Sequence, residues 1–166
     1  RCNFSISKRV GVRSARGSMN SLHKKYQPFI TLICRLLLGG VLLVAGGLKV
    51  FKPSESAGAV AAYKILPTDL AHLVGYALPW FEVALGILLI IGLTTRLAAI
   101  AGTAVMIIFT AAIISVWARG ILIDCGCFGG GGEIDPSKAS EARRAYLMEI
   151  LRDLGLALSG IYLYFF

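Results

Sequence analysis

The chain has 166 residues, of which 57% are hydrophobic and only 16% are charged, and its net charge is +8. A soluble domain carries roughly 25% charged residues, so this composition excludes an ordinary soluble protein. The apolar residues gather in blocks near the length of about 20 residues that a helix needs to cross a bilayer, which predicts an integral membrane protein.

Residues 1–27 form a basic tail. Seven basic residues and no acidic one precede Gln27: Arg1, Lys8, Arg9, Arg13, Arg16, Lys24 and Lys25. A basic tail can bind nucleic acid, but Lys and Arg ahead of a first membrane span more often stay in the cytoplasm and fix the orientation. We therefore expect a disordered tail, a cytoplasmic N-terminus and no nucleic-acid partner.

The first predicted span covers residues 29–48 and contains Arg35. A charged residue this deep in a membrane usually faces the interior of a helix bundle or a partner. Gly46 lies on the same face, and small residues let a neighbouring helix approach closely. Lys49 and Lys52 close the span. The following stretch, residues 53–70, has an apolar middle too short to cross a bilayer, and it predicts a short helix at the membrane surface.

The second and third predicted spans cover residues 71–93 and 97–118. The second carries Glu82 on a face of small residues that should point inward. The third carries no charge. Only a very short turn separates the two, which predicts antiparallel neighbours.

The stretch Asp124-Cys125-Gly126-Cys127-Phe128-Gly129 follows the third span and leads into a run of glycines. Asp135-Pro136 predicts the start of a helix. The fourth predicted span covers residues 145–166 and carries Glu149, Arg152 and Asp153 at spacings i, i+3 and i+4.

These elements predict an all-α fold, an integral membrane four-helix bundle with a short interfacial helix between the first two spans. Residues 28–166 would form one membrane domain behind the basic tail. With the tail inside, the spans alternate sides, so the cysteine loop lies outside the cytoplasm and the C-terminus inside.

Cys125 and Cys127 are the candidate functional thiols. A disulfide persists only in an oxidising compartment, such as the predicted outer face. A bridge over one residue closes a small ring, and small strained disulfides are more labile than structural ones. A positive neighbour such as Arg119 would favour the reactive thiolate. Zinc needs more ligands than are at hand, and a purely structural bridge over one residue would constrain little. We predict no metal site and assign no role to Cys2 or Cys34.

Four ionisable residues lie within or near the predicted spans: Arg35, Glu82, Arg152 and Asp153. Their depths, estimated from the helical rise of about 1.5 Å per residue, allow contacts between helices. Two interpretations remain open: salt bridges that fix helix pairing, or a polar cluster that supports a redox site.

Several short motifs resemble one known family. They are residues 35–39 and 45–49, Tyr63-Lys64-Ile65-Leu66-Pro67, Leu78-Pro79-Trp80-Phe81-Glu82, residues 95–99, the stretch from Arg119 to Gly129, and Leu151-Arg152-Asp153. Together they make the chain similar to the MauE/DoxX redox-associated membrane proteins over residues 30–166. The resemblance implies a four-helix protein of the bacterial inner membrane that is linked to thiol redox and works with an exported thioredoxin-like partner. MauE itself is associated with methylamine utilisation and with maturation of a disulfide-rich exported dehydrogenase subunit.

The leading hypothesis is a membrane thiol–disulfide oxidoreductase that acts through Cys125 and Cys127 on exported proteins, with a quinone as a candidate electron acceptor by analogy with other four-helix disulfide-generating proteins. The alternative is a non-enzymatic membrane subunit or assembly factor of a larger complex. The sequence alone does not decide between them, nor does it give the oligomeric state.

Overall fold

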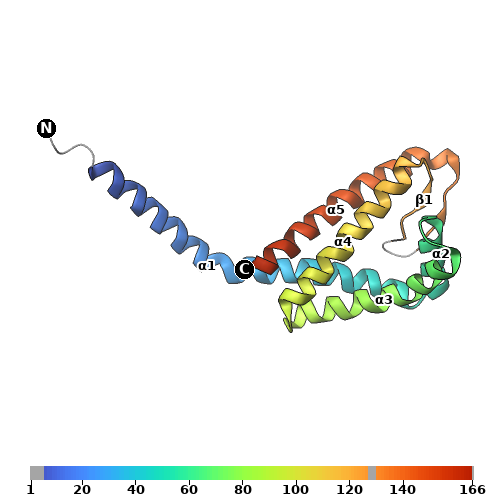
Figure 1. Ribbon diagram of the computed structural model, residues 1–166, viewed down its shortest axis with the longest axis horizontal. Helices are drawn as coiled ribbons and strands as arrows, with labels where there is room; N and C mark the ends of the chain where they lie inside the picture. The colour runs from blue at the N-terminus through green and yellow to red at the C-terminus, as the bar shows by residue number, and fades with distance from the viewer. Residues whose placement is uncertain (1–5, 127–129, 166) are drawn as a thin grey trace.

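The computed structural model describes residues 6–126 and 130–165, with side chains from Tyr26 onward. The elements follow one another as α1 (Ile6–Val50), α2 (Pro53–Ala62), α3 (Thr68–Ile91), α4 (Thr95–Ala118), β1 (Ile123–Asp124), β2 (Gly132–Glu133), the short 3₁₀ helix η1 (Pro136–Lys138) and α5 (Ala139–Phe165) (Figure 1). The described part of the chain is therefore helical apart from one very short hairpin. The helix α1 begins within the stretch predicted as a disordered tail.

Three helices are long and apolar enough to cross a membrane, judged by length and composition. They are residues Tyr26–Val50 of α1, the whole of α3 and the whole of α4, with mean hydropathies of 2.3, 2.0 and 2.5. Each contains most of one predicted span, so the first three spans are confirmed as candidates. The glycine at position 92 has a φ of 86° and ends α3, as is common where a helix stops in a left-handed turn.

The fourth predicted span lies in α5, which has 27 residues. This helix is not among the candidate spans found in the described part of the chain. Glu149, Arg152 and Asp153 fall in its middle and lower its hydropathy below that of the other three. A four-span membrane bundle therefore stays a prediction, although α5 packs along α4 and also touches α1.

The long helices form two pairs. In Figure 1, α1 runs beside α3 and α4 runs beside α5, and the pairs converge near the turn between α3 and α4. Toward the other end the pairs diverge, and α2 and the hairpin lie there. Side chains from all four helices meet in one core, which includes Leu38, Leu89, Ala99 and Ala157.

Glycines bring α1 and α3 into backbone contact. A Cβ atom added at Gly46 would lie 2.7 Å from the Pro79 carbonyl oxygen, and one at Gly86 would lie 2.8 Å from the Gly39 carbonyl oxygen. Both distances are too short for a side chain, so these positions need glycine. The small residues predicted to allow close approach do so here.

The short helix α2 docks on the N-terminal half of α3. The Ser56 hydroxyl donates a hydrogen bond to the Gly75 carbonyl oxygen at 2.8 Å, and a Cβ atom at Gly75 would lie 2.5 Å from the Cα atom of Ala57. A short helix between the first two spans is thus present. Its location at the membrane surface stays a prediction.

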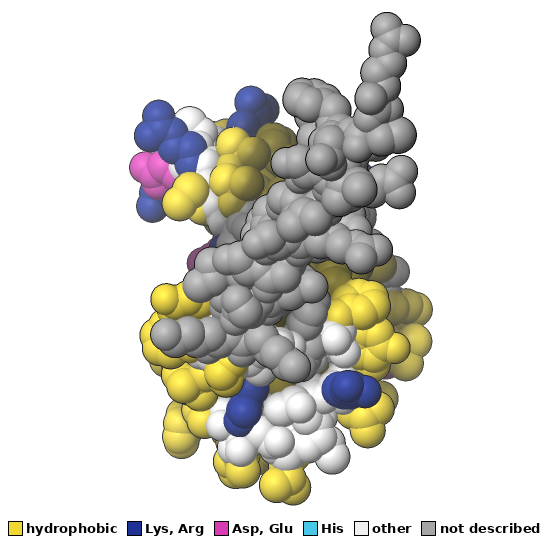
Figure 2. All heavy atoms as spheres, turned by 90° about the vertical axis from the view of Figure 1, so that its left-hand side faces the viewer, with side chains coloured by type: hydrophobic (Ala, Val, Ile, Leu, Met, Phe, Trp, Pro, Cys, Tyr) yellow, Lys and Arg dark blue, Asp and Glu magenta, His cyan; other side chains and the backbone are white. Residues whose placement is uncertain are grey.

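The outer surface is rich in large apolar side chains, as Figure 2 shows for one face. Exposed examples occur on every long helix, including Leu37 and Val44 on α1, Ile91 on α3, Ile108 on α4 and Leu158 on α5. Soluble monomers rarely expose apolar patches of this extent. The described surface therefore suits contact with lipid.

Candidate functional site

A β-hairpin holds Cys125 at the end of the molecule where the helix pairs diverge. Strands β1 and β2 pair antiparallel, with Ile123 opposite Glu133 and Asp124 opposite Gly132. The loop between them includes Gly126, Gly130 and Gly131, with φ angles of 66°, 79° and 119°. Positive φ angles favour glycine, which explains why the glycine run follows the cysteines.

Two tyrosine hydroxyls fix the backbone around Cys125. The buried Tyr146 hydroxyl of α5 accepts a hydrogen bond from the Ile123 N–H at 2.9 Å and lies 2.9 Å from the Ile123 carbonyl oxygen, to which it can donate. The Tyr63 hydroxyl, just after α2, donates to the Cys125 carbonyl oxygen at 3.1 Å. The cysteine is thereby held between α2 and α5 through its backbone.

The hairpin loop also packs directly on α2. A Cβ atom added at Gly131 would lie 2.4 Å from the Cβ atom of Ala59, and one at Gly126 would lie 2.8 Å from the same atom. At the outer edge, the Lys64 ammonium lies 2.7 Å from the Glu133 carboxylate. This ion pair lowers the pKa of the Glu133 carboxyl below its usual range, because the ammonium donates a hydrogen bond to the charged form.

Arg119 takes part in the same scaffold. Its guanidinium donates hydrogen bonds to the carbonyl oxygens of Tyr63 and Lys64, which follow the C-terminal end of α2, and to that of Ser115. The sequence suggested Arg119 as a neighbour that would favour the thiolate. In the structure, the hydrogen bonds of Arg119 instead connect α4 with the end of α2.

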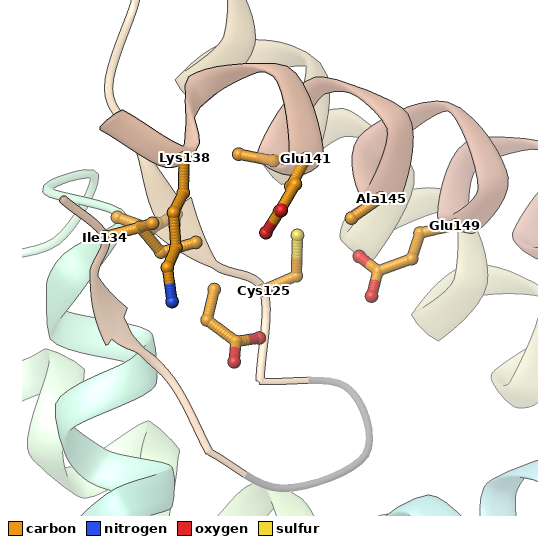
Figure 3. Close-up of a pocket in the computed structure, with 9 residues that line it drawn as sticks. Cys125, Ile134, Lys138, Glu141, Ala145 and Glu149 are labelled. Carbon is orange, nitrogen blue, oxygen red and sulfur yellow. The ribbon is translucent and has the colours of Figure 1, made fainter. Parts of the chain in front are cut away.

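The Cys125 side chain is 7% exposed and lines a cavity of about 210 Å³ beneath the hairpin. Carboxyl groups surround this cavity: those of Asp124, Glu141 and Glu149, with Lys138 as the cationic side chain in its lining. Figure 3 shows the sulfur of Cys125 and the Glu149 carboxyl group on facing sides of the cavity. The thiol therefore lies in a small, polar and predominantly acidic chamber.

The Cys125 thiol and the Glu149 carboxyl group share a side-chain hydrogen bond. The second carboxyl oxygen of Glu149, Oε2, is buried and has no hydrogen-bond partner within the part of the chain that the structure describes. A carboxylate in contact with a thiol can accept its proton. Glu149 is thus placed to exchange a proton with Cys125.

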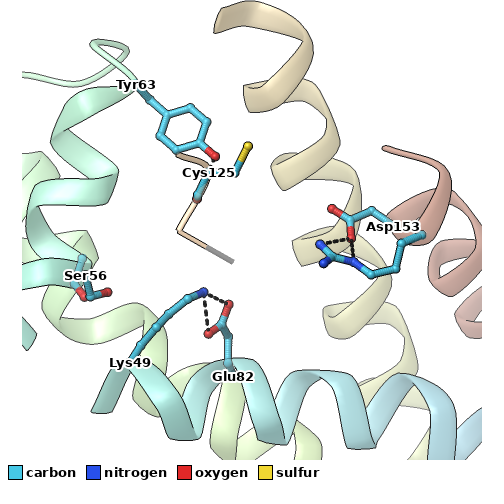
Figure 4. Close-up of polar contacts among 8 residues, drawn as sticks. Lys49, Ser56, Tyr63, Glu82, Cys125 and Asp153 are labelled. Atoms are coloured by element: carbon cyan, nitrogen blue, oxygen red, sulfur yellow. Dashed lines mark hydrogen bonds and ion pairs between the residues drawn. The ribbon is translucent and has the colours of Figure 1, made fainter. Parts of the chain in front are cut away.

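Two pairs of buried charges lie below the cysteine. The Lys49 ammonium is 3.1 Å from the Glu82 carboxylate, and the Arg152 guanidinium is 2.8 Å from the carboxylate of its neighbour Asp153. Glu82 and Asp153 are fully buried. Figure 4 shows the two pairs on opposite sides of the interior, with Cys125 above them.

Arg35 does not join these pairs. Its guanidinium donates hydrogen bonds of 2.9 and 3.0 Å to the carbonyl oxygens of Leu89 and Ile90, at the C-terminal end of α3. Those residues lie two turns of α3 beyond Glu82. Arg35 therefore neutralises the partial negative charge at the C-terminus of α3. Of the four predicted polar residues, only Glu82, Arg152 and Asp153 belong to the two ion pairs below Cys125.

The other cysteines separate into two groups. Cys34 is half-buried and packs against the core of the four long helices. Cys127 and Cys2 lie outside the described residues, so the pairing of Cys125 with Cys127 stays a prediction.

Sequence reasoning missed three residues of this region. Lys49 was interpreted as the end of a span, Glu149 was not connected to the thiol, and Tyr146 was not considered. The spacing of Glu149, Arg152 and Asp153 on one helical face was the available signal, because such a face must point away from lipid.

Comparison with known proteins gives a consistent result. Residues 27–166 match the model of a family described as "Methylamine utilisation protein MauE". The methylamine utilization protein MauE of Methylophilus methylotrophus is 32% identical over 138 residues, which are 82% of this chain and 67% of that protein. The proteins of the same name from Paracoccus denitrificans and Methylorubrum extorquens are each 31% identical over 106 residues, 63% of this chain and 57% of theirs. No solved structure matches. The DoxX part of the resemblance stays a prediction.

Proposed function

Because the chain belongs to the MauE family of methylamine utilisation proteins, we propose that it is a membrane thiol–disulfide redox protein that acts through Cys125 and Cys127. Its clients would be exported proteins, reached directly or through a thioredoxin-like partner. By the same proposal it serves methylamine utilisation, as the names of its relatives state for them. One observation carries the proposal: the Cys125 thiol is fixed in a small cavity in hydrogen-bond contact with the Glu149 carboxyl group.

The proposed location follows from the charge pattern. The protein would lie in the bacterial inner membrane as a four-span bundle with α5 as the last span, the basic N-terminus in the cytoplasm and α2 at the outer surface. The hairpin with Cys125 would then face the oxidising side, where disulfides persist. The exposed apolar surface of the described helices supports burial in lipid.

The chemistry is a disulfide exchange. A client thiolate attacks the Cys125–Cys127 disulfide, so that an S–S bond forms between client and protein while the original bond breaks. A second client thiolate attacks this mixed disulfide and releases both cysteines. The client loses two electrons and gains a disulfide, and the two protons of its thiols pass to Cys125 and Cys127. Glu149 would exchange the proton of Cys125 in both directions.

The central test is a mixed-disulfide trap. With Cys127→Ser, the Cys125 thiolate can still attack an oxidised client, as in the reverse of the exchange, but no neighbouring thiol resolves the mixed disulfide, so an adduct should accumulate and be identifiable by mass spectrometry. Cys34→Ser in the same background is the matched control and should leave the adduct unchanged. If neither Cys125→Ser nor Cys127→Ser altered any adduct or any exported disulfide, the proposal would be lost.

A second test addresses Glu149. Glu149→Gln keeps the shape and a hydrogen-bond acceptor but cannot take a proton, so exchange should slow by about tenfold or more. Glu141→Gln is the matched control, because Glu141 lines the same cavity but is exposed. Equal rates in the two variants, measured across a pH series, would remove Glu149 from the reaction.

The alternative function is a non-enzymatic subunit or assembly factor of a larger membrane complex. The observation that favours it is the low exposure of Cys125, which restricts access to its thiol. Stoichiometric copurification with a partner complex that persists in a variant without cysteines would support this alternative over the redox proposal.

A further inference from the structure

A second and larger cavity lies on the other side of Cys125. Its volume is about 470 Å³, and its walls come from α2 and the residues after it, α3, α4, the hairpin loop and Lys49 of α1. Ligand pockets typically span about 300–1,000 Å³ and are mostly apolar with a few polar groups. This cavity fits that description, since its lining is dominated by residues such as Val74, Phe81, Ile108 and Phe109.

The position of this cavity restricts what can enter it. Its lining includes residues of α3 and α4, both of which are long and apolar enough to cross a membrane. A molecule that reaches it from the bilayer must therefore be soluble in lipid.

One polar group in the lining offers a free donor. The Lys49 ammonium has three N–H groups, of which two point to the Glu82 carboxylate oxygens at 3.1 and 3.2 Å. It also lies 5.3 Å from the centre of the Phe109 ring. The third N–H has no hydrogen-bond acceptor among the residues that the structure describes. The ammonium is paired with Glu82, so a neutral ligand with an acceptor oxygen beside an aromatic wall matches this arrangement.

Cys125 lines both cavities. On one side its thiol contacts the Glu149 carboxyl group, and on the other side lies the apolar cavity. Figure 4 shows Cys125 and Tyr63 above the Lys49–Glu82 pair. Cys125, Tyr63 and Lys49 all line the apolar cavity. An electron acceptor in the apolar cavity would thus be next to the proposed redox thiol.

We propose that this cavity binds a lipid-soluble quinone, which reoxidises the cysteine pair. The inference rests on the proposed function, because the pair needs an oxidant after each exchange. In the step, Cys125 and Cys127 lose two electrons and form their S–S bond. The quinone gains the two electrons, and the two thiol protons are added to its carbonyl oxygens to give the quinol. A lipid acyl chain could fill the same volume, but it would leave the Lys49 donor unused and could accept no electrons.

The experiment uses the full chain in lipid nanodiscs, reduced and kept without oxygen, with decylubiquinone as the added quinone. Two readouts are taken: the quinone retained by the protein, and quinol formation by absorbance together with loss of alkylatable thiols. Ala112→Phe places a ring in the cavity, whereas Ala111→Phe adds the same ring at the exposed neighbouring position outside it. We expect Ala112→Phe to lower retention and the rate of quinol formation by about tenfold or more, because an added ring overpacks a filled cavity. Ala111→Phe should match the unmodified protein.

A second variant guards against misfolding. Phe109→Leu removes a ring from the wall without adding volume, and it should also weaken quinone retention. If both Ala112→Phe and Phe109→Leu retained and reduced the quinone like the unmodified protein, the cavity would not be the site and the inference would be overturned. If no quinone were reduced while the mixed-disulfide trap still captured clients, this inference would fail and the proposed function would stand. If the quinone bound in the cavity while the cysteines neither oxidised nor formed adducts, the redox step and the proposed function would fail together.

Discussion

The Lys49 ammonium of α1 is paired with the Glu82 carboxylate of α3. Their side chains are 7% and 0% exposed. A buried ion pair adds little net stability compared with apolar residues, but the loss of one partner leaves an uncompensated charge. The pair therefore matters most as a constraint that fixes the register of α1 against α3.

Loss of one partner of this buried pair should therefore cost more stability than loss of an exposed pair or of both partners together. Lys49→Met should destabilise the fold by about 3–5 kcal/mol, because Glu82 is left buried without its cation. Thermal unfolding in detergent or nanodiscs measures the effect. Lys52→Met breaks the exposed Lys52–Glu55 pair and should cost about 0–1 kcal/mol. The double variant Lys49→Met, Glu82→Gln should recover most of the lost stability, and an additive loss would contradict this account.

At the residue scale, the sequence predicted the kinds of group but not their partners. Glu82 and Asp153, which were expected within or near the spans, are fully buried. Their pairing was not predictable, since Glu82 meets Lys49 from a position 33 residues away along the chain. The contact between Cys125 and Glu149 likewise depends on how the hairpin folds back over α5, which no helical spacing encodes.

At the scale of the elements, the contact between α1 and α3 depends on small residues at a few positions. Gly46 and Gly47 are adjacent in sequence but differ in surroundings. A Cβ atom at Gly46 would meet Pro79, Glu82 and Val83 within 3 Å, whereas one at Gly47 would have nothing within 4 Å. Comparing substitutions at these two adjacent positions therefore separates the effect of helix contact from the effect of replacing a glycine within a helix.

Gly46→Ala should destabilise the protein by about 1–3 kcal/mol, because the added methyl group forces the helices apart. Gly47→Ala should be neutral or stabilising by up to about 1 kcal/mol, since alanine favours a helix over glycine. The midpoints of thermal unfolding of the two variants give the comparison. Equal gains in both would show that helix propensity, and not contact, decides the outcome.

The contact between the hairpin and α2 should depend on pH. The pKa of Glu133 is lowered by the hydrogen bond from Lys64, so the pair stabilises the docked hairpin above the ordinary pKa of a glutamate. That contribution is lost as the pH falls through the lowered pKa. The Ile134 N–H donates to the Leu122 carbonyl oxygen beside this pair, and its hydrogen exchange, corrected for the intrinsic rate, should speed up at low pH. Glu133→Gln should remove this pH dependence, and an unchanged profile in that variant would exclude the pair as its cause. The effect should be small because both side chains are exposed.

The long helices were predictable because their apolar runs have the length of a membrane span. The hairpin was not, because two strands of two residues each leave no alternating pattern. Its trace in the sequence was the glycine run, which supplies positive φ angles at Gly130, Gly131 and Gly132.

At the scale of the whole molecule, the fold predicts which segments share a side of the membrane. The hairpin and α2 lie at one end and the turn between α3 and α4 at the other (Figure 1). In a background with Cys2, Cys34, Cys125 and Cys127 replaced by serine, Glu133→Cys should react with a membrane-impermeant maleimide in intact cells. Thr94→Cys should react only after the membrane is opened. The reverse pattern would invert the topology and place the hairpin in the cytoplasm.

The overall class was predictable from composition, whereas the role of α5 was not. Its apolar second half suggested a span, but Glu149, Arg152 and Asp153 give it a polar face that packs toward α4 and α1. The spacing indicated that this face points away from lipid, and the tertiary arrangement shows what it meets: Glu149 lines the cavity with Cys125, and Asp153 is fully buried.

Cys125 is held almost entirely through main-chain atoms: its own carbonyl group, those of its neighbours and the carbonyl groups at the end of α2. Among the side chains of the hairpin, Ile123 is fully buried and packs in the same core cluster as Cys125. The position of the cysteine therefore depends on these main-chain bonds and on Ile123, and not on the exposed side chains of the hairpin. Substitutions at exposed hairpin side chains should therefore leave the reactive atom in place, whereas substitutions at Gly131 or Ile123 should displace it.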